Sequence, residues 1–137
     1  MTSNGYDIRV LPACSMEDHH AHLLRLDYLD RCLFFANGND DHAVDAHCLR
    51  LLSSQAIVIG AYEQGRLRAS VEIIPDRGCK RAAATLIAER DYQTDDLAQM
   101  MMTRACDEAK KHGLGRLDVV GMTGEPQTIR TQMARFG

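Results

Sequence analysis

The sequence predicts a single α/β domain, residues 1–137, built on a mixed, mostly antiparallel sheet that is flanked by helices. The length of 137 residues leaves room for one domain. A hydrophobic fraction of 45% beside a charged fraction of 26% is ordinary for a soluble globular protein. Segments with the two-residue period of strands alternate along the chain with segments of helical period, which is the pattern of an α/β fold.

The first half of the chain predicts a strand and two helical regions. Pro12 closes a segment in which apolar and polar residues alternate. Ser15, with Asp18 three residues later, has the pattern of a capping box that opens a helix. The tripeptide Asn37–Asn39, with its central glycine, breaks this helical region. The expected elements are a strand at Tyr6–Leu11, a helical region at Ser15–Phe34 and a second helix from Asp40 or Asp41 to about Gln55.

The second half predicts a meander of three strands, and then a strand between two helices. Glu63–Gly65 is typical of a turn between two β-rich runs. Thr94 has the position of an N-cap, and Gly113 follows the last turn of that helix and ends it. Pro126 can open a last helix, because proline is favoured in the first turn. The expected strands are Ala56–Tyr62, Leu67–Ile73, Ala82–Ala88 and Leu117–Gly121, and the helices are Thr94–Gly113 and a segment from Pro126.

Composition excludes several classes of function. A net charge of −3, aromatic residues at 5% and the lack of tryptophan argue against a nucleic-acid groove. No apolar run approaches 18 residues, so we expect no membrane span, and the N-terminal residues lack the pattern of a secretory signal. Five cysteines, an odd number without a C-x-x-C pair, indicate free thiols and a cytoplasmic protein.

Two groups of histidines and aspartates could suggest a metal site. Adjacent side chains on a helix diverge, so only part of each group could converge on one ion. Zinc would need further ligands from elsewhere in the chain. We therefore expect no metal, two polar helix faces in solvent, and His47 in the core because it lies on an apolar stripe. The groups are Asp18, His19, His20 and His22, and His42, Asp45 and His47.

Three segments, and the order of the expected elements, resemble a known family. Asp91–Gln93 leads into a helix that ends in alanine, basic residues and glycine, as a phosphate-binding loop and its helix do in that family. Asp30–Phe35 resembles an early-helix motif of one bacterial branch, and Met133–Gly137 resembles the penultimate helix and the glycine after it. Over roughly residues 6 to 137 the chain thus resembles the GNAT superfamily of N-acetyltransferases.

The resemblance implies a GNAT-like sheet that lacks the family's last two strands, and acetyl-CoA as cofactor. In the family a helix N-terminus presents backbone N–H groups to the pyrophosphate, and a β-bulge in the preceding strand exposes partners for the acyl-pantetheine arm. By this resemblance Ile87 and Ala88 line the acyl arm, whereas the pyrophosphate is faced by Gln93, Leu97, Ala98 and Gln99.

The sequence departs from the family at the loop and at the catalytic positions. Thr94 and Asp96 replace the loop glycines, and Asp95 adds a second carboxylate. Like charges about 4 Å apart repel by roughly 4 kcal/mol at an effective dielectric near 20, so we expect weak or lost cofactor binding. Ala82–Ala84 stands where many members have a glutamate base. Thr123–Glu125 and Arg130–Gln132 contain neither the family's asparagine nor its tyrosine acid, so no catalytic residue is assigned.

Charged side chains elsewhere could complete such a site. Carboxylates near strand ends could act as substitute bases. A basic loop could hold the 3′-phosphate of coenzyme A or an acidic partner, or be solvated. The carboxylates are Glu72, Glu89 and Asp91, and the loop residues are Arg77, Lys80 and Arg81.

Two functions are consistent with these observations. The first is an acetyl-CoA-dependent N-acyltransferase that acts on a small-molecule or protein amine. The second is a non-catalytic sensor or protein-interaction module that keeps the scaffold without the cofactor. A homodimer is also expected, because the strand Leu117–Gly121 would otherwise leave a hydrophobic edge exposed.

Overall fold

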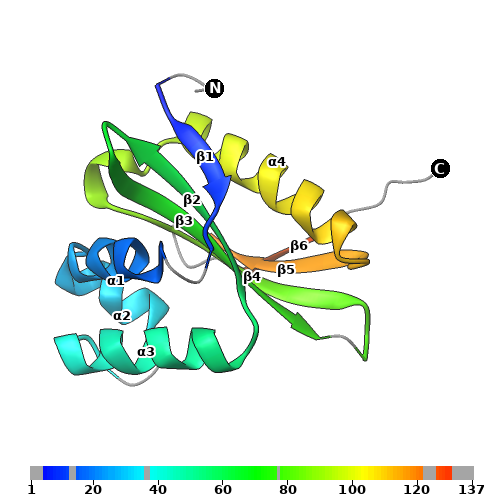
Figure 1. Ribbon diagram of the computed structural model, residues 1–137, viewed down its shortest axis with the longest axis horizontal. Helices are drawn as coiled ribbons and strands as arrows, with labels where there is room; N and C mark the ends of the chain where they lie inside the picture. The colour runs from blue at the N-terminus through cyan, green and yellow to red at the C-terminus, as the bar shows by residue number, and fades with distance from the viewer. Residues whose placement is uncertain (1–4, 13–14, 36–37, 77, 122–125, 131–137) are drawn as a thin grey trace.

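A computed structural model describes residues 5–12, 15–35, 38–76, 78–121 and, for the backbone alone, 126–130. Within these residues one sheet has six strands in the order β1-β2-β3-β4-β5-β6, with α1, α2 and α3 on one face and α4 on the other (Figure 1). The strands are β1 Asp7–Val10, β2 Ile57–Glu63, β3 Arg66–Asp76, β4 Arg81–Ala88, β5 Arg116–Val120 and β6 Pro126–Arg130. The helices are α1 Met16–Leu24, α2 Tyr28–Phe34, α3 Asp41–Ser53, a short 3₁₀ turn at Arg90–Tyr92, and α4 Asp95–Lys111.

The expected mixed, mostly antiparallel sheet is confirmed. Every neighbouring pair of strands is antiparallel except β4 and β5, which run parallel from Arg81↔Arg116 to Thr85↔Val120. A parallel pair needs a long crossover, and α4 provides it. Because β4 ends at Ala88, it continues for three residues beyond its last pair with β5.

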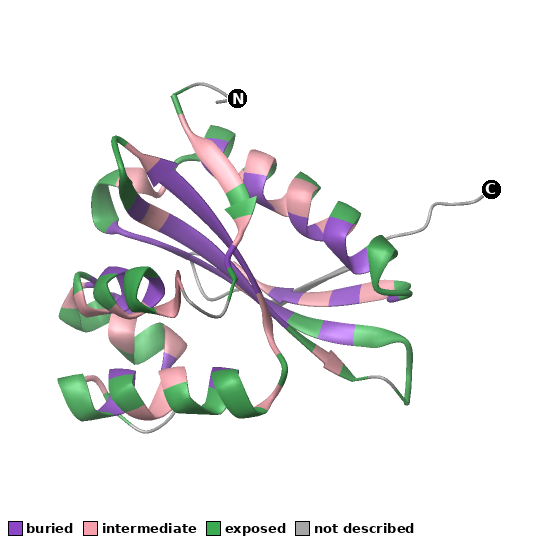
Figure 2. Ribbon diagram, viewed as in Figure 1, coloured by how far each residue is buried: buried purple, intermediate pink, exposed green. Residues whose placement is uncertain are grey.

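The core lies on both faces of the sheet, and Figure 2 shows buried residues in the central strands and along α1, α3 and α4. On the α4 face, alternate strand residues such as Ile59 and Val71 pack with Leu97 and Met101 of the helix. On the opposite face a separate cluster joins the helices to Ile87 of β4. The alternation that predicts the strands therefore also assigns their side chains to two layers.

Both predicted ends of α4 are confirmed, and the predicted cap of α1 is wrong. Thr94 accepts the N–H of Leu97 at 3.3 Å, and Gly113, with a φ of +74°, follows the end of α4. Ser15 makes no side-chain cap at α1. Its φ and ψ of −100° and 10° are not the extended values of a capping residue, and Asp18 instead accepts a hydrogen bond from the Tyr62 hydroxyl at 2.7 Å.

The single helical region expected at Ser15–Phe34 is also wrong, because α1 and α2 are separate helices. Asp27 has an extended backbone with a ψ of 174°, and its carboxylate accepts the N–H of Asp30 at 2.9 Å. This cap starts a new helix in the middle of the segment. Asp40 caps α3 in the same way, through the N–H of Ala43 at 2.9 Å, as expected.

The expected last helix is wrong as well, since Pro126–Arg130 forms β6. It pairs antiparallel with β5 from Val120↔Pro126 to Arg116↔Arg130. Proline is tolerated as the first residue of a strand, and the β-branched Thr128 and Ile129 favour extended backbone. Since β6 covers the edge of β5, the reason given above for self-association no longer applies, and the homodimer stays an untested prediction. Among the described residues, no helix has the length and apolar character needed to cross a membrane.

Candidate functional site

The end of β4 has backbone groups that face away from β3. Glu89 N–H donates to the Arg68 carbonyl of β3 at 3.1 Å, and the backbone groups of a strand alternate in direction. Leu86 and Ala88 therefore direct their N–H and C=O groups toward the β5 side. No strand in the described part of the chain pairs with β4 on that side beyond Thr85. In a parallel ladder the pairing of Thr85 with Val120 uses the Leu86 N–H, so the groups beyond it are the Leu86 carbonyl and the Ala88 N–H and carbonyl. We call these three backbone groups the free edge of β4.

The expected β-bulge is not in this strand. The β3–β4 register runs without a shift from Ala69↔Ala88 to Asp76↔Arg81. The register shift in the sheet lies between Ala61 and Tyr62 of β2. The free edge therefore results from the different lengths of β4 and β5, without a bulge in β4.

The side chain of Gln93 reaches the free edge. Its Nε2 donates to the Ala88 carbonyl at 3.1 Å and to Asp30 Oδ2 of α2 at 3.0 Å. A 3₁₀ turn after β4 reverses the chain and positions Gln93 for both contacts. One amide thus links β4, the connection to α4 and the first turn of α2.

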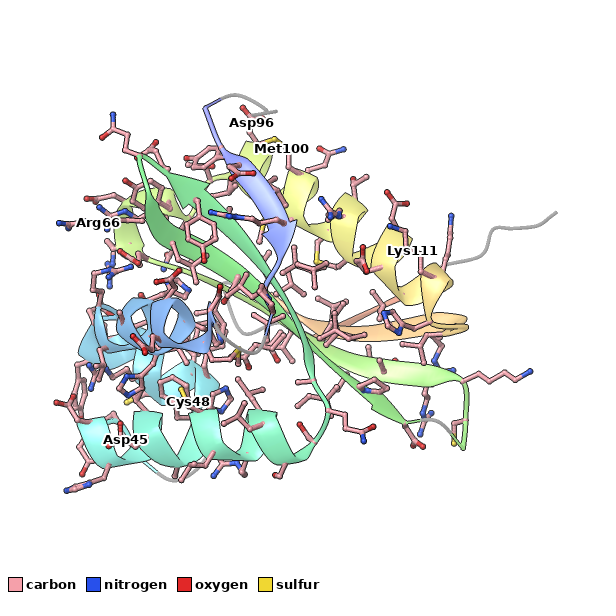
Figure 3. All side chains as sticks on the ribbon, viewed as in Figure 1. Asp45, Cys48, Arg66, Asp96, Met100 and Lys111 are labelled. Atoms are coloured by element: carbon pink, nitrogen blue, oxygen red, sulfur yellow. The ribbon has the colours of Figure 1, made fainter. Side chains whose placement is uncertain are left out.

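The N-terminus of α4 follows directly, and Figure 3 shows Asp96 at this end of the helix and Lys111 at the other. The first N–H groups of a helix have no hydrogen-bond partner within it. The Thr94 hydroxyl accepts a hydrogen bond from one of them, the N–H of Leu97. The N–H groups of Asp95 and Asp96 remain for an anion, which the helix dipole also favours. The exposed carboxylates of these two residues oppose an anion at the same place.

The structure brings together some of the expected cofactor residues and separates others. Ala88 and Gln93 meet at the free edge, and Leu86, which we did not single out, shares that edge. Ile87 is fully buried in the cluster of Leu23, Leu26, Phe35 and Val44 and directs its backbone groups to β3. The side chains of the α4 residues differ in burial: Leu97 is buried in the core, Ala98 is half-buried and Gln99 is exposed. Leu86 is identified by the alternation of backbone directions along β4: because Glu89 and Ile87 face β3, Ala88 and Leu86 face the opposite side.

Glu72 lies on the face of the sheet that α1, α2 and α3 cover, which we call the helical face. The sequence predicted that the histidines of α1 near it would be exposed to solvent. Its side chain, 2% exposed, accepts from His19 Nε2 of α1 at 2.7 Å and from His47 Nε2 of α3 at 2.7 Å. Burial alone would raise the pKa of Glu72, but the two imidazole N–H groups outweigh it and lower the pKa to about 2. His47 is partly buried and contacts the ring of Phe35.

The expected polar face of α1 is therefore wrong for two of its three histidines. His19 and His22 are fully buried, and only His20 reaches the surface, where it pairs with Asp45 at 2.7 Å. Buried carboxylates on β3 and after β4 compensate the buried imidazoles, a long-range pairing that helical spacing does not reveal. Within the described residues no group of three or more such side chains could hold a metal ion.

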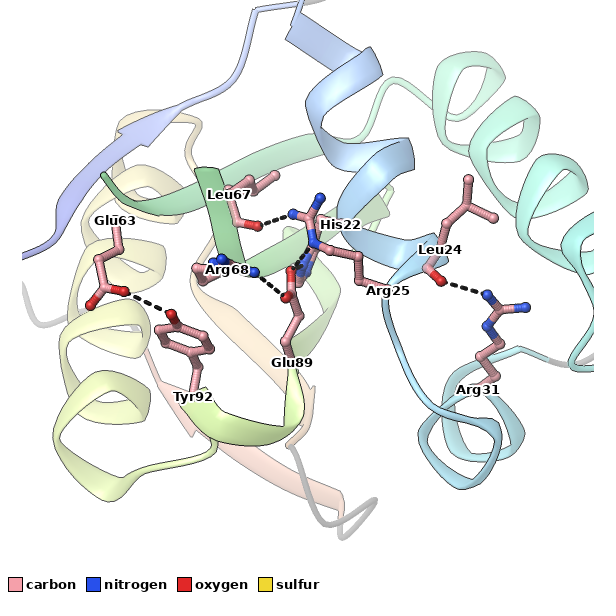
Figure 4. A network of polar contacts seen from close by, with 9 residues as sticks. All are labelled: His22, Leu24, Arg25, Arg31, Glu63, Leu67, Arg68, Glu89 and Tyr92. Atoms are coloured by element: carbon pink, nitrogen blue, oxygen red, sulfur yellow. Dashed lines mark hydrogen bonds and ion pairs between the residues drawn. The ribbon is translucent and has the colours of Figure 1, made fainter. Parts of the chain in front are cut away.

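Glu89 is the centre of a second buried network (Figure 4). Its carboxylate accepts from His22 Nδ1 and Arg25 Nε, each at 2.9 Å, and from Arg68 at 2.8 Å. Burial would raise the pKa of Glu89, but these donors lower it below the usual range. Both Glu72 and Glu89 are thus fixed as anions by positive or imidazole partners, which makes them weak bases. Asp91 is exposed on the 3₁₀ turn.

Asp30 differs from these carboxylates. Its side chain is 5% exposed in the first turn of α2, and its partner there is the neutral amide of Gln93. Burial, reinforced by the negative charge of Asp27, raises the pKa of Asp30. In the sequence Asp30 stands out only as part of a helix motif, because its burial depends on tertiary packing.

The basic loop is distant from the free edge. Lys80 and Arg81 are exposed at the start of β4, whereas Ala88 is at its end. Arg81 and Ala88 are seven positions apart along the strand, or roughly 23 Å at 3.3 Å per residue. Exposure to solvent therefore explains these basic side chains better than contact with a ligand at the free edge. Arg77 lies outside the described residues.

Known structures match this architecture, although the sequence has no match: no protein-family model matches it, and neither does any curated protein. A GNAT-family acetyltransferase from Streptococcus pneumoniae superposes with a TM-score of 0.60 at 17% identity, over 83% of this chain and 73% of that one. The ribosomal-protein-S5-alanine acetyltransferase from Vibrio fischeri gives 0.63 at 10% identity, over 87% and 72%. The chain has the GNAT acetyltransferase fold. The PaiA N-acetyltransferase from Thermoplasma acidophilum, solved in complex with coenzyme A, gives 0.58 at 14% identity, over 83% and 77%.

This GNAT fold carries no carboxylate on the first half of β4. Ala82 and Ala84 are buried against α4, and Ala83 is exposed on the other face. The positions Thr123–Glu125 and Arg130–Gln132, where the resemblance placed further catalytic residues, lie outside the residues whose side chains are described. The described carboxylates that chain position or contacts place at the free edge are Glu89, which follows Ala88, and Asp30, which shares the Gln93 amide with the Ala88 carbonyl.

Proposed function

We propose that the protein is an acyltransferase that binds acetyl-CoA along the free edge of β4 and transfers the acyl group to an amine. One observation carries this proposal: β4 extends beyond its last pair with β5. Leu86 and Ala88 therefore direct backbone groups to an edge beside a helix N-terminus. The GNAT fold supports it, and one structural neighbour was solved with coenzyme A.

The residues present fit one part of the cofactor better than another. The extended Leu86 and Ala88 backbone would hold the pantetheine arm as a strand holds a partner strand. Ala88 C=O already accepts from Gln93, so this amide would have to move for a ligand to take its place. At the α4 N-terminus, Asp95 and Asp96 oppose a diphosphate. We therefore propose weak binding of the cofactor.

Acetyl-CoA would supply an acyl group activated as a thioester. The chain's own contribution is to align and polarise: a backbone N–H directed at an acyl oxygen stabilises negative charge on it, and costs no reorganisation because the strand is rigid. The Ala88 N–H is the donor that the free edge offers, and the Leu86 carbonyl is an acceptor. The acceptor would be a small-molecule or protein amine, and the described free cysteines support a cytoplasmic location.

Backbone amide NMR with titrated acetyl-CoA tests the proposal directly, and the chain contains its own control. We expect the amide signal of Ala88 to shift most along β4. Ile87 precedes it, but its N–H points to β3 and should shift least. Calorimetry on the same sample gives the affinity. An absence of binding at millimolar acetyl-CoA, or shifts confined to residues away from β4 and α4, would overturn the proposal and favour a non-catalytic module.

A further inference from the structure

Asp30 is a buried carboxylate held close to the free edge of β4. It lies in the first turn of α2, where Asp27 caps its N–H at 2.9 Å. Its Oδ2 accepts from Gln93 Nε2 at 3.0 Å, and the same nitrogen donates to the Ala88 carbonyl at 3.1 Å. Two hydrogen bonds therefore connect the carboxylate to the edge.

The charged groups around Asp30 leave it without an ion pair in the described part of the chain. Arg90, the cation on the neighbouring 3₁₀ turn, pairs with Asp27 on the surface. The acidic neighbour Asp27 disfavours a negative charge on Asp30, and Arg90 favours it more weakly. The remaining side-chain contacts are the neutral amide of Gln93 and the carboxyl group of Asp27, and neither is a cation. An ionised Asp30 is thus a buried anion that lacks a cation, an arrangement that costs free energy until a positive group arrives.

We propose that Asp30 receives the protonated amine of the acyl acceptor and removes one of its protons. This rests on the proposed function, and it names the acceptor class as a primary amine that is cationic at neutral pH. The Gln93 amide occupies the place of the ammonium in the free protein. Glu72 and Glu89 do not compete for this role, because each already has two or three imidazole or guanidinium partners.

The proton balance is simple. The ammonium R–NH₃⁺ gives one proton to the Asp30 carboxylate, which leaves R–NH₂ with a free electron pair on nitrogen and a neutral carboxylic acid. The acid returns the proton to solvent when the product leaves. A carboxylate in a buried site is a stronger base than one in water, so the low dielectric around Asp30 assists the transfer.

Asp30→Asn tests this role with little change in shape. Asparagine keeps an oxygen that can accept from Gln93, and it removes the charge. The probes are butylammonium and its neutral counterpart butanol, each titrated into ¹³C-aspartate-labelled protein with coenzyme A present. We expect butylammonium to shift the Asp30 carboxyl signal and to bind at least tenfold more weakly to Asp30→Asn. Butanol binding and the affinity for coenzyme A should stay within twofold.

Asp91→Asn is the matched control, because it removes an exposed aspartate from the adjoining turn and should bind both probes as the natural chain does. A urea titration shows that the variants fold. Since the pKa of Asp30 is raised in the folded state, ionisation destabilises the fold as pH rises above the unfolded value, so Asp30→Asn should be at least as stable at pH 7.

The proposal is overturned if Asp30→Asn binds butylammonium within twofold of the natural chain, or if the natural chain binds butylammonium no better than butanol. Failure of the proposed function has a different signature: the Ala88 amide would not respond to acetyl-CoA. In that case the butylammonium titration without coenzyme A still decides whether Asp30 is a cation site.

Discussion

Replacement of Glu72 by glutamine should strongly destabilise the protein. This carboxylate joins α1 and α3 to β3 through His19 and His47. Its pKa falls from an ordinary 4.5 to about 2 in the folded protein. At 1.36 kcal/mol per pKa unit, the ionised carboxylate contributes about 3 kcal/mol to the free energy of unfolding. That is a large part of the 5–15 kcal/mol typical of a domain.

The contribution has a defined pH window. A carboxylate with a lowered pKa stabilises the fold above its unfolded pKa, and the stabilisation is lost as pH falls from about 4.5 to about 2. Urea unfolding at pH 7, 5 and 3 should therefore show a gap between Glu72→Gln and the natural chain that narrows toward acid. Glu17→Gln, on the exposed face of α1, is the control and should change little. A gap below 1 kcal/mol at pH 7, or one that stays constant to pH 3, would refute the reasoning.

Two further predictions concern the cofactor loop and the thiols. Thr94→Gly combined with Asp96→Gly should tighten acetyl-CoA binding at least tenfold in calorimetry, or roughly 1.4 kcal/mol. Asp95→Asn should change the affinity less than twofold. A low-micromolar affinity of the natural chain for acetyl-CoA would contradict this prediction. In folded protein at pH 8, Cys48 should react with a thiol reagent far more slowly than exposed Cys32, because burial and nearby carboxylates raise the pKa of Cys48 to about 11. All five thiols should react after denaturation without reductant, and three or fewer would contradict the expectation of free cysteines.

The features that the sequence predicts well are local ones. Thr94 caps α4 through a residue three positions away, and Gly113 ends it through its own backbone conformation, so neighbours in the chain are sufficient. Pro126 is ambiguous, because proline suits the first residue of a helix and of a strand, and pairing with β5 decides between them. The contact of His19 with Glu72 spans 53 residues, and no spacing rule reaches that far.

Different interactions attach the helices to the two faces of the sheet, and the difference makes the proposed site sensitive to pH. The α4 face is a continuous apolar cluster. The helical face adds two buried polar bridges, one centred on Glu72 and one on Glu89, whose strength depends on ionisation. Acid therefore weakens the attachment of α1 and α3 while the packing of α4 persists. Because α2 connects these helices and carries Asp30, the side that would receive the amine is more sensitive to pH than the helix that would face the phosphates.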